Sequence, residues 1–95
     1  ANSFNARSDA RLKENLRSIT TNDSLLTLPL YKYDYINGNK DQIGCLAQDL
    51  QKICPELVTT GEDGYLRIQE SKIVYLLLDE VKKLKAEVEE LKTKA

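Results

Sequence analysis

"QESKIVYLLLDEVKKLKAEVEELKTK", residues 69–94, contains no proline or glycine. Its apolar side chains recur at alternating steps of three and four residues, which is the heptad spacing of a coiled coil. We therefore predict a long helix with one apolar seam along it. The seam consists of Val74, Leu77, Val81, Leu84, Val88 and Leu91.

The charges beside this seam indicate how several such helices would pair. With Val74 at heptad position a, Glu80 and Glu87 fall at g, and Lys85 and Lys92 fall at e. A glutamate at g meets the e lysine of the following heptad only when chains run parallel, so a parallel bundle is favoured. Valine at a with leucine at d favours dimers in simple peptides, but an attached domain can override this preference. The alternative is a helix that packs on its own domain, since three heptads are the minimum for predicting a coiled coil.

Two β-hairpins are predicted before this helix. In "LYKYDYI" (30–36) aromatic and polar residues alternate, and "NGN" (37–39) provides a turn before the returning strand "DQIGC" (41–45). A second pair of β-rich runs flanks "GEDG" (61–64) within residues 56–68. Both hairpins are short, and they indicate a compact unit rather than a parallel sheet.

Short helices are predicted around the first hairpin. "LAQDLQKIC" (46–54) is apolar on one side and ends at the proline that follows it. "SLLTL" (24–28) forms a helical turn or two, capped by Asn22 or Asp23 and stopped by Pro29.

The start of the chain is predicted to contain one more helix. Leucine or isoleucine at positions 12, 16 and 19 follows Ser8 at helical spacing, and Ser8 and Asp9 suit a first helical turn. Residues 1–7 lack such a pattern, and we expect a linker or the end of a preceding domain. The chain is therefore expected to be part of a longer protein, although removal of an initiator methionine before Ala1 would give the same start.

Together these elements predict an α+β fold, with a small globular part (8–68) followed by a coiled-coil helix (69–94). The 95 residues suit one small domain, and 41% hydrophobic with 31% charged residues exclude a disordered chain and a membrane protein. The net charge of −1 is not that of a nucleic-acid-binding protein. Because a domain of this size has a marginal core, we expect the chain to assemble.

Histidine is absent, which excludes histidine-dependent triads and histidine-ligated metal sites. Cys45 and Cys54 are nine residues apart and match no metal or redox spacing, so we expect free thiols and neither a metal nor a cofactor. A disulfide between them is the alternative in an oxidising compartment. Without histidine, the base that remains for activating a serine is a neutral lysine.

Ser8 and Lys13 in "SDARLKEN" (8–15) are candidates for such a pair. A lysine titrates near pH 10.4 in water, so a lysine base must be desolvated, and Asp9 and Glu14 must face away from it. Five helical residues rotate by about 500°, which leaves about 140° between the two side chains, and five strand residues place them on opposite faces. A local dyad therefore needs a bent turn at Ser8, or a serine and a lysine from different chains. The alternative is that Ser8 caps a helix and Lys13 is a solvated charge.

Four motifs, in order, resemble one known family. "SDARLKENL" (8–16) resembles the opening signature of the C-terminal intramolecular chaperone auto-processing domain. This self-cleaving peptidase module ends phage tailspikes, tail fibres and neck appendages, and also occurs in transcription factors of the myelin regulatory factor type. "YKYDYINGN" (31–39) is similar to its aromatic strand and turn, "IGCLAQDLQKICPELV" (43–58) to its central helix and stop, and residues 65–92 to its closing segment and trimeric helix. One departure is "TTNDSLLTLP" (20–29), where many relatives have a longer helix.

The resemblance implies autoproteolysis between Arg7 and Ser8. Ser8 would attack the carbonyl of Arg7 with Lys13 as its base, so that the chain from Ser8 onward is released. Residues 1–7 would then be the linker or the end of the preceding fibre domain. Three further residues occupy signature positions without an assigned role: Asp9, Arg11 and Asn15.

The resemblance also implies a homotrimer that aligns an upstream fibre or appendage domain of the same chain. The expected place of action is the host cytoplasm during virion assembly, where the chain is the precursor of a tail component. Neither nucleic acid nor a membrane is an expected partner. Two alternatives are a non-catalytic trimerisation module and the auto-processing domain of a membrane-bound transcription factor.

Overall fold

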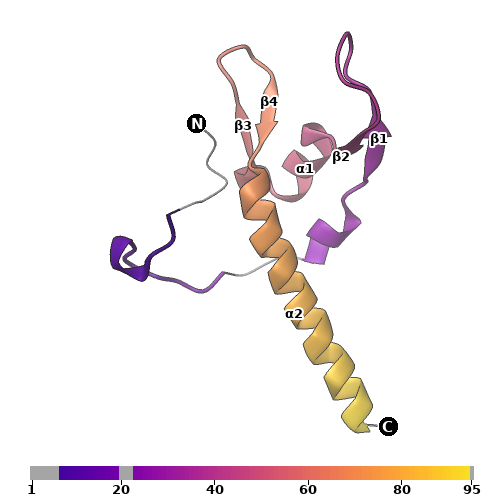
Figure 1. Cartoon of the computed structure of the whole chain (residues 1–95). Coiled ribbons are helices and arrows are strands. Elements are labelled where there is room, and N and C mark those ends of the chain that lie inside the picture. Colours follow the sequence, from indigo (N-terminus) through magenta and orange to yellow (C-terminus); the bar gives the residue numbers. More distant parts are fainter. Residues whose placement is uncertain (1–6, 20–22, 95) are drawn as a thin grey trace.

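A computed structural model describes residues 7–19 and 23–94 (Figure 1). Three parts follow one another: an N-terminal arm (7–19), a body of short helices and hairpins (23–69) and a long C-terminal helix. In Figure 1 the arm lies on one side of the long helix and the first hairpin lies on the other. The predicted α+β class is confirmed, whereas the trimeric bundle stays a prediction because the structure contains one chain.

The first hairpin pairs β1 (Tyr31–Tyr33) with β2 (Gln42–Gly44) in antiparallel register. The connecting loop is longer than a tight turn, and two of its residues, Asn37 (φ 56°) and Asp41 (φ 57°), adopt left-handed backbone. Asn and Asp tolerate this conformation better than other residues with a β-carbon. A β-carbon at Gly38 would meet that of Tyr35 at 2.9 Å, so glycine is needed there. The predicted hairpin is confirmed, with shorter strands.

The second hairpin pairs β3 (Val58–Thr60) with β4 (Leu66–Ile68), also antiparallel. The amide of Gly61 donates to the carbonyl of Tyr65 at 2.9 Å and closes the loop. Gly64 has φ +84°, a conformation in which glycine has no steric cost. The "GEDG" turn predicted from the sequence is therefore confirmed.

One short helix precedes the first hairpin and two lie between the hairpins. They are η2 (Asp23–Thr27, 3₁₀), α1 (Ala47–Ile53) and η3 (Pro55–Leu57, 3₁₀). The predicted helices at 24–28 and 46–54 are thus confirmed, the first as a 3₁₀ helix. The proposed cap Asn22 lies outside the described residues.

The core of the body is small. Its fully buried hydrophobic residues are Leu25, Leu50 and Leu57, with 6%, 0% and 1% of their surface exposed. Burying one such side chain contributes about 1.5–3 kcal/mol, so three of them give only marginal stability to a folded domain. Partly buried residues around them are Leu28, Cys54, Val58, Ile68, Ile73 and Leu76.

The long helix α2 (Glu70–Lys94) confirms the helix predicted over 69–94 to within one residue. Ile73 and Leu76 near its start pack against the core, and the rest of the helix extends away from the body (Figure 1). Seam residues are exposed in the single chain, from 43% at Leu77 to 67% at Leu91. The seam is therefore free for contact with other chains. None of the helices in the described ranges is both long and apolar enough to cross a membrane.

One glutamate predicted to pair between chains has a partner within its own chain. Glu80 has only 2% of its surface exposed, and its carboxylate accepts from Lys83 Nζ of the same chain at 3.4 Å. The pairing of Glu80 with Lys85 of a neighbouring helix stays a prediction, because the structure contains one chain.

The predicted helix at the start of the chain is also wrong beyond one turn. Only η1 (Ala10–Leu12), a 3₁₀ helix, forms, and Lys13 is already extended (φ −119°, ψ 142°). Short isolated helices are unstable in water unless an apolar face packs on something. The three large apolar side chains of the arm stay mostly exposed, with exposed fractions of 58%, 81% and 53% at Leu12, Leu16 and Ile19.

Candidate functional site

The serine and lysine singled out in the sequence flank the η1 turn. Asp9 is its N-cap, and its Oδ1 accepts a hydrogen bond from the Arg11 amide at 2.9 Å. The turn is closed by amides of Leu12 and Lys13, which donate to the carbonyls of Asp9 (3.0 Å) and Ala10 (3.1 Å). The tight turn thus bends the chain back on itself within five residues.

This bend brings Ser8 and Lys13 together. Lys13 Nζ donates to Ser8 Oγ at 2.8 Å. Neither a regular α-helix nor a strand could pair residues five apart, but a 3₁₀ turn with extended residues at both ends does so. The pair is local and lies within one chain.

Asp9 and Arg11 form a two-pronged ion pair beside the serine and lysine. Arg11 Nε donates to Asp9 Oδ1 at 3.1 Å, and Arg11 Nη2 donates to Asp9 Oδ2 at 2.8 Å. The hydrogen bonds from Arg11 hold the pKa of Asp9 below its ordinary value, and Asp9 in turn raises the pKa of Arg11. Both carboxylate oxygens of Asp9 are therefore engaged by Arg11. This agrees with the expectation that the charge of Asp9 faces away from Lys13.

Asn15, the third signature residue, has a backbone role in the structure. Its φ of 54° lies in the left-handed region, which Asn tolerates better than most residues. Its carbonyl accepts a hydrogen bond from Arg17 Nη1 at 2.6 Å. Asn15 thus redirects the chain directly after the turn, a function that its position in the sequence did not reveal.

The Ser8–Lys13 pair is open to solvent in the single chain. Ser8, Lys13 and the preceding Arg7 are all exposed. The structure therefore places the two side chains in contact but does not bury them.

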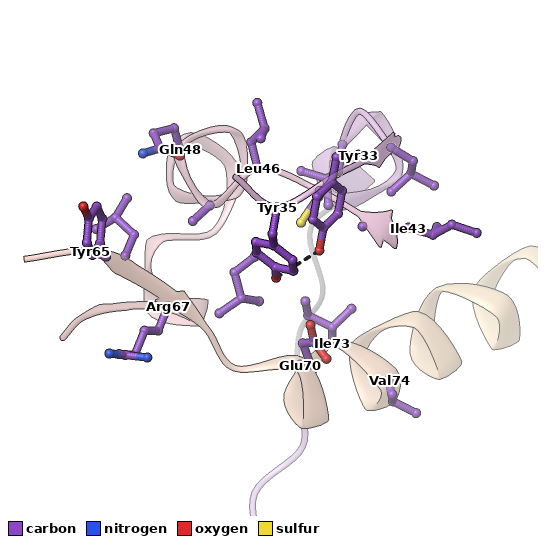
Figure 2. A pocket seen from close by; sticks show the side chains of 17 residues that line it. Tyr33, Tyr35, Ile43, Leu46, Gln48, Tyr65, Arg67, Glu70, Ile73 and Val74 are labelled. Carbon is purple, nitrogen blue, oxygen red and sulfur yellow. Dashed lines mark hydrogen bonds between the residues drawn. The ribbon is translucent and has the colours of Figure 1, made fainter. Parts of the chain in front are cut away.

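A groove in the body was not predicted from the sequence. It has a volume of about 750 Å³ and lies between β1, β2, α1, β4 and the first turns of α2 (Figure 2). Tyr33 and Tyr35 form one wall, with their rings edge to face, 5.1 Å between centroids and a 3.2 Å hydrogen bond between hydroxyls. Their i, i+2 spacing within the strand predicted over 30–36 was the available signal, because alternate residues of a strand share a face. In the structure Tyr35 lies two residues beyond the end of β1.

Cys45 also lines this groove. Its thiol is partly buried, and burial raises its pKa, with further contributions from the negative charges of Glu70 and Asp49. Cys45 and Cys54 are both free, as predicted. Within the described residues no cluster of three or more Cys, Asp or Glu side chains could hold a metal ion.

Comparison with known proteins establishes the family. The family model described as "Chaperone of endosialidase" matches residues 8–59, more than half of the chain. This chain belongs to that family. The predicted resemblance to the intramolecular chaperone domain is therefore confirmed, and the match begins at Ser8. The family's model is also named as a peptidase.

The relatives of this chaperone domain are phage fibre proteins. Long tail fiber protein Gp37 of Enterobacteria phages M1 and Ox2 is 36% identical over 98 residues, which span 92% of this chain and 39% of each relative. Gp37 of phage K3 is 35% identical over 98 residues, spanning 93% of this chain and 8% of that protein. The chain thus corresponds to a minor part of each of these relatives.

Proposed function

We propose that this chain is the intramolecular chaperone of a phage tail-fibre precursor, which trimerises, aligns the upstream fibre and then cuts itself off between Arg7 and Ser8. Membership of the chaperone family and the similarity to tail-fibre proteins support the chaperone role. The observation that carries the cleavage is the 2.8 Å contact between Lys13 Nζ and Ser8 Oγ, at the first residue of the family match.

The cleavage follows from this contact in two steps. When Lys13 is neutral, its Nζ takes the proton of Ser8 Oγ, and the oxygen attacks the carbonyl carbon of Arg7. The Arg7–Ser8 amide bond breaks as Lys13 returns the proton to the leaving nitrogen, so that Arg7 is held to Ser8 Oγ as an ester. Water, deprotonated by Lys13, then hydrolyses the ester to leave the carboxylate of Arg7 and the free hydroxyl of Ser8.

Assembly would align the upstream fibre segments and would remove water from the Ser8–Lys13 pair. In three parallel chains, the six exposed seam residues of α2 would pack against one another and so set a common register. Joining the chains first raises the effective concentration of the upstream fibre segments, whose long-range pairings otherwise form slowly. Packing of neighbours around the arm would also remove water from Lys13, so cleavage waits until assembly is complete.

The first experiment measures cleavage by intact mass in a chain that carries its upstream fibre domain. Ser8→Ala and Lys13→Arg are expected to stay whole, because one lacks the nucleophile and the other cannot give up its proton. A general base contributes about 10²–10⁴-fold, so Lys13→Arg should slow cleavage at least about 100-fold. Ser18→Ala and Lys40→Arg, at other exposed positions, are matched controls that should cleave normally.

A second experiment measures assembly by light scattering. The wild type is expected at three times the 10.8 kDa of one chain, whereas Leu84→Asn places an amide in the seam and should yield smaller species. Lys82→Asn, on an exposed face beside the seam, is the control that should still assemble. A stable single chain that cleaves at the full rate would contradict the proposed coupling. Trimers that never cleave would support a non-catalytic trimerisation module instead.

A further inference from the structure

The arm and the groove are two surfaces of this chain that are exposed to solvent. The groove is lined by exposed apolar and aromatic side chains, among them Leu30 (74% exposed), Leu46 (50%) and Tyr65 (76%). The arm displays three apolar side chains to solvent, and the hydrogen bonds of its described residues, such as those from Lys13 to Ser8 and from Arg17 to Asn15, lie within the arm itself. We propose that the arm of one protomer docks in the groove of a second copy of this chain, which rests on the assembly proposed above.

Charge favours this pairing. Residues 7–19 contain four basic and two acidic side chains, so the arm carries a net charge of +2. Glu70 lies on the groove, and Asp49 is close enough for its charge to act on Cys45 in the groove wall. Arg67 also lines the groove, but its positive charge is offset by an ion pair with Asp63 at 3.0 Å, which leaves Glu70 to attract a basic arm.

The position of the groove favours a neighbouring copy over the arm of the same chain. Val74 belongs both to the groove and to the coiled-coil seam, and it is 63% exposed. A second chain packed along the seam therefore lies next to the groove. Figure 1 shows the arm on the opposite side of α2 from the β1–β2 hairpin, which contributes residues to the groove. In a threefold ring each arm can fill the next groove, and the exchange closes on itself.

Docking of the arm would connect assembly to cleavage. The Ser8–Lys13 pair lies in the N-terminal half of the arm, four residues or fewer from Leu12. Seating Leu12 and Leu16 against a neighbour places the lysine near protein rather than water. The pair that is exposed in one chain would thus lose its solvent only in the assembled molecule.

Cysteine cross-linking tests the exchange directly, because Cys45 already lies in the groove. Two chains are refolded together in a Cys54→Ser background. One carries Leu16→Cys with Cys45→Ser, and the other keeps Cys45 as its single thiol. A short bismaleimide at pH 8.5 is expected to join the two chains into a covalent pair visible by denaturing electrophoresis.

Lys92→Cys in place of Leu16→Cys is the control. It lies about 28 Å along α2 from Ile73 at the groove, beyond the reach of the reagent, and should give no covalent pair. Absence of a pair from the arm cysteine in assembled protein would overturn the exchange but leave the proposed function standing. Absence of assembly, measured by light scattering on the same samples, would overturn both. A cross-link only within single chains that carry both Leu16→Cys and Cys45 would show that the arm covers its own groove, which also contradicts the proposal.

A substitution in the groove gives an independent test. Leu46→Lys places a positive charge in the groove and should reduce the covalent pair and slow cleavage at least about tenfold. Ile36→Lys, at a 95% exposed position of the first hairpin outside the groove, should change neither. Unchanged cross-linking and cleavage in Leu46→Lys, with assembly retained, would contradict the docking of the arm.

Discussion

The arm and the body contain similar apolar residues, but different interactions hold the two regions in shape. Leu25, Leu50 and Leu57 of the body are almost fully buried, whereas Leu16 of the arm is 81% exposed. The arm instead takes its shape from hydrogen bonds between residues two to five apart, including the one between Lys13 and Ser8. Local hydrogen bonds can set the geometry of a catalytic pair, but they cannot keep it dry. In the single chain the contact between Ser8 and Lys13 is therefore shaped but not buried.

The two regions should differ most in how much a leucine contributes to the free energy of unfolding. Leu50→Ala leaves a cavity in a small core and should lower the free energy of unfolding by about 2–5 kcal/mol. Leu16→Ala removes an exposed side chain and should change it by less than about 0.5 kcal/mol. Urea unfolding followed by circular dichroism measures both, in a Leu84→Asn background so that assembly does not contribute. Equal losses in the two variants would mean that the arm packs within its own chain.

Much of the body and of α2 was predictable because its signals are local. Heptad spacing without proline or glycine gave α2 to within one residue, and the proline after Cys54 marked the end of α1. The loop "GEDG" marked the second hairpin. In the arm, by contrast, helical spacing was misleading. Spacing creates an apolar face, but a face stabilises a helix only when something packs on it.

The candidate site was predictable in its residues but not in its geometry. The absence of histidine directed attention to Ser8 and Lys13, and the requirement for a bent turn followed from helix and strand geometry. That the turn would be a 3₁₀ helix capped by Asp9 depends on hydrogen bonds that no periodicity encodes. The groove brings together residues up to 46 positions apart, from Leu28 to Val74, and such long-range packing leaves little trace in one sequence.

The pKa shifts of Cys54 in the body and of Asp9 in the arm have different main causes. Burial is the largest cause that raises the pKa of Cys54 to about 11, followed by its hydrogen bond to Glu56 and the charge of that carboxylate. The thiolate is the reactive form, so Cys54 at pH 8 should react with a disulfide reagent roughly 100-fold more slowly than an ordinary cysteine.

The rate is measured in a Cys45→Ser variant, so that one thiol remains. Glu56→Gln should accelerate the reaction only in part, because the burial of the thiol is unchanged. Glu62→Gln, which removes an exposed charge from the second hairpin loop, is the control. Full recovery of the ordinary rate in Glu56→Gln would show that local hydrogen bonding outweighs burial in the body as well.

In the arm, hydrogen bonds from Arg11 lower the pKa of Asp9, and the expected effect on stability is small. A lowered pKa means that the ionised form stabilises the turn above the ordinary aspartate pKa, and this stabilisation is lost as the pH falls through the lowered value. The carboxyl carbon of Asp9, followed by NMR, should therefore titrate at lower pH than an ordinary aspartate. Arg11→Leu should return the midpoint to the ordinary range.

Cleavage should respond to the same pair by a modest factor. Asp9→Ala removes both the cap and the ion pair and should slow cleavage about fivefold to tenfold, while Asp9→Asn keeps a capping side chain and should lose less. Glu14→Gln removes a negative charge next to Lys13 without touching the ion pair, and no slowing is expected. If Glu14→Gln slowed cleavage as much as Asp9→Ala, net charge near the lysine, and not the shape of the turn, would govern the reaction. The arm would then resemble the body, with its function set by surroundings rather than by its own hydrogen bonds.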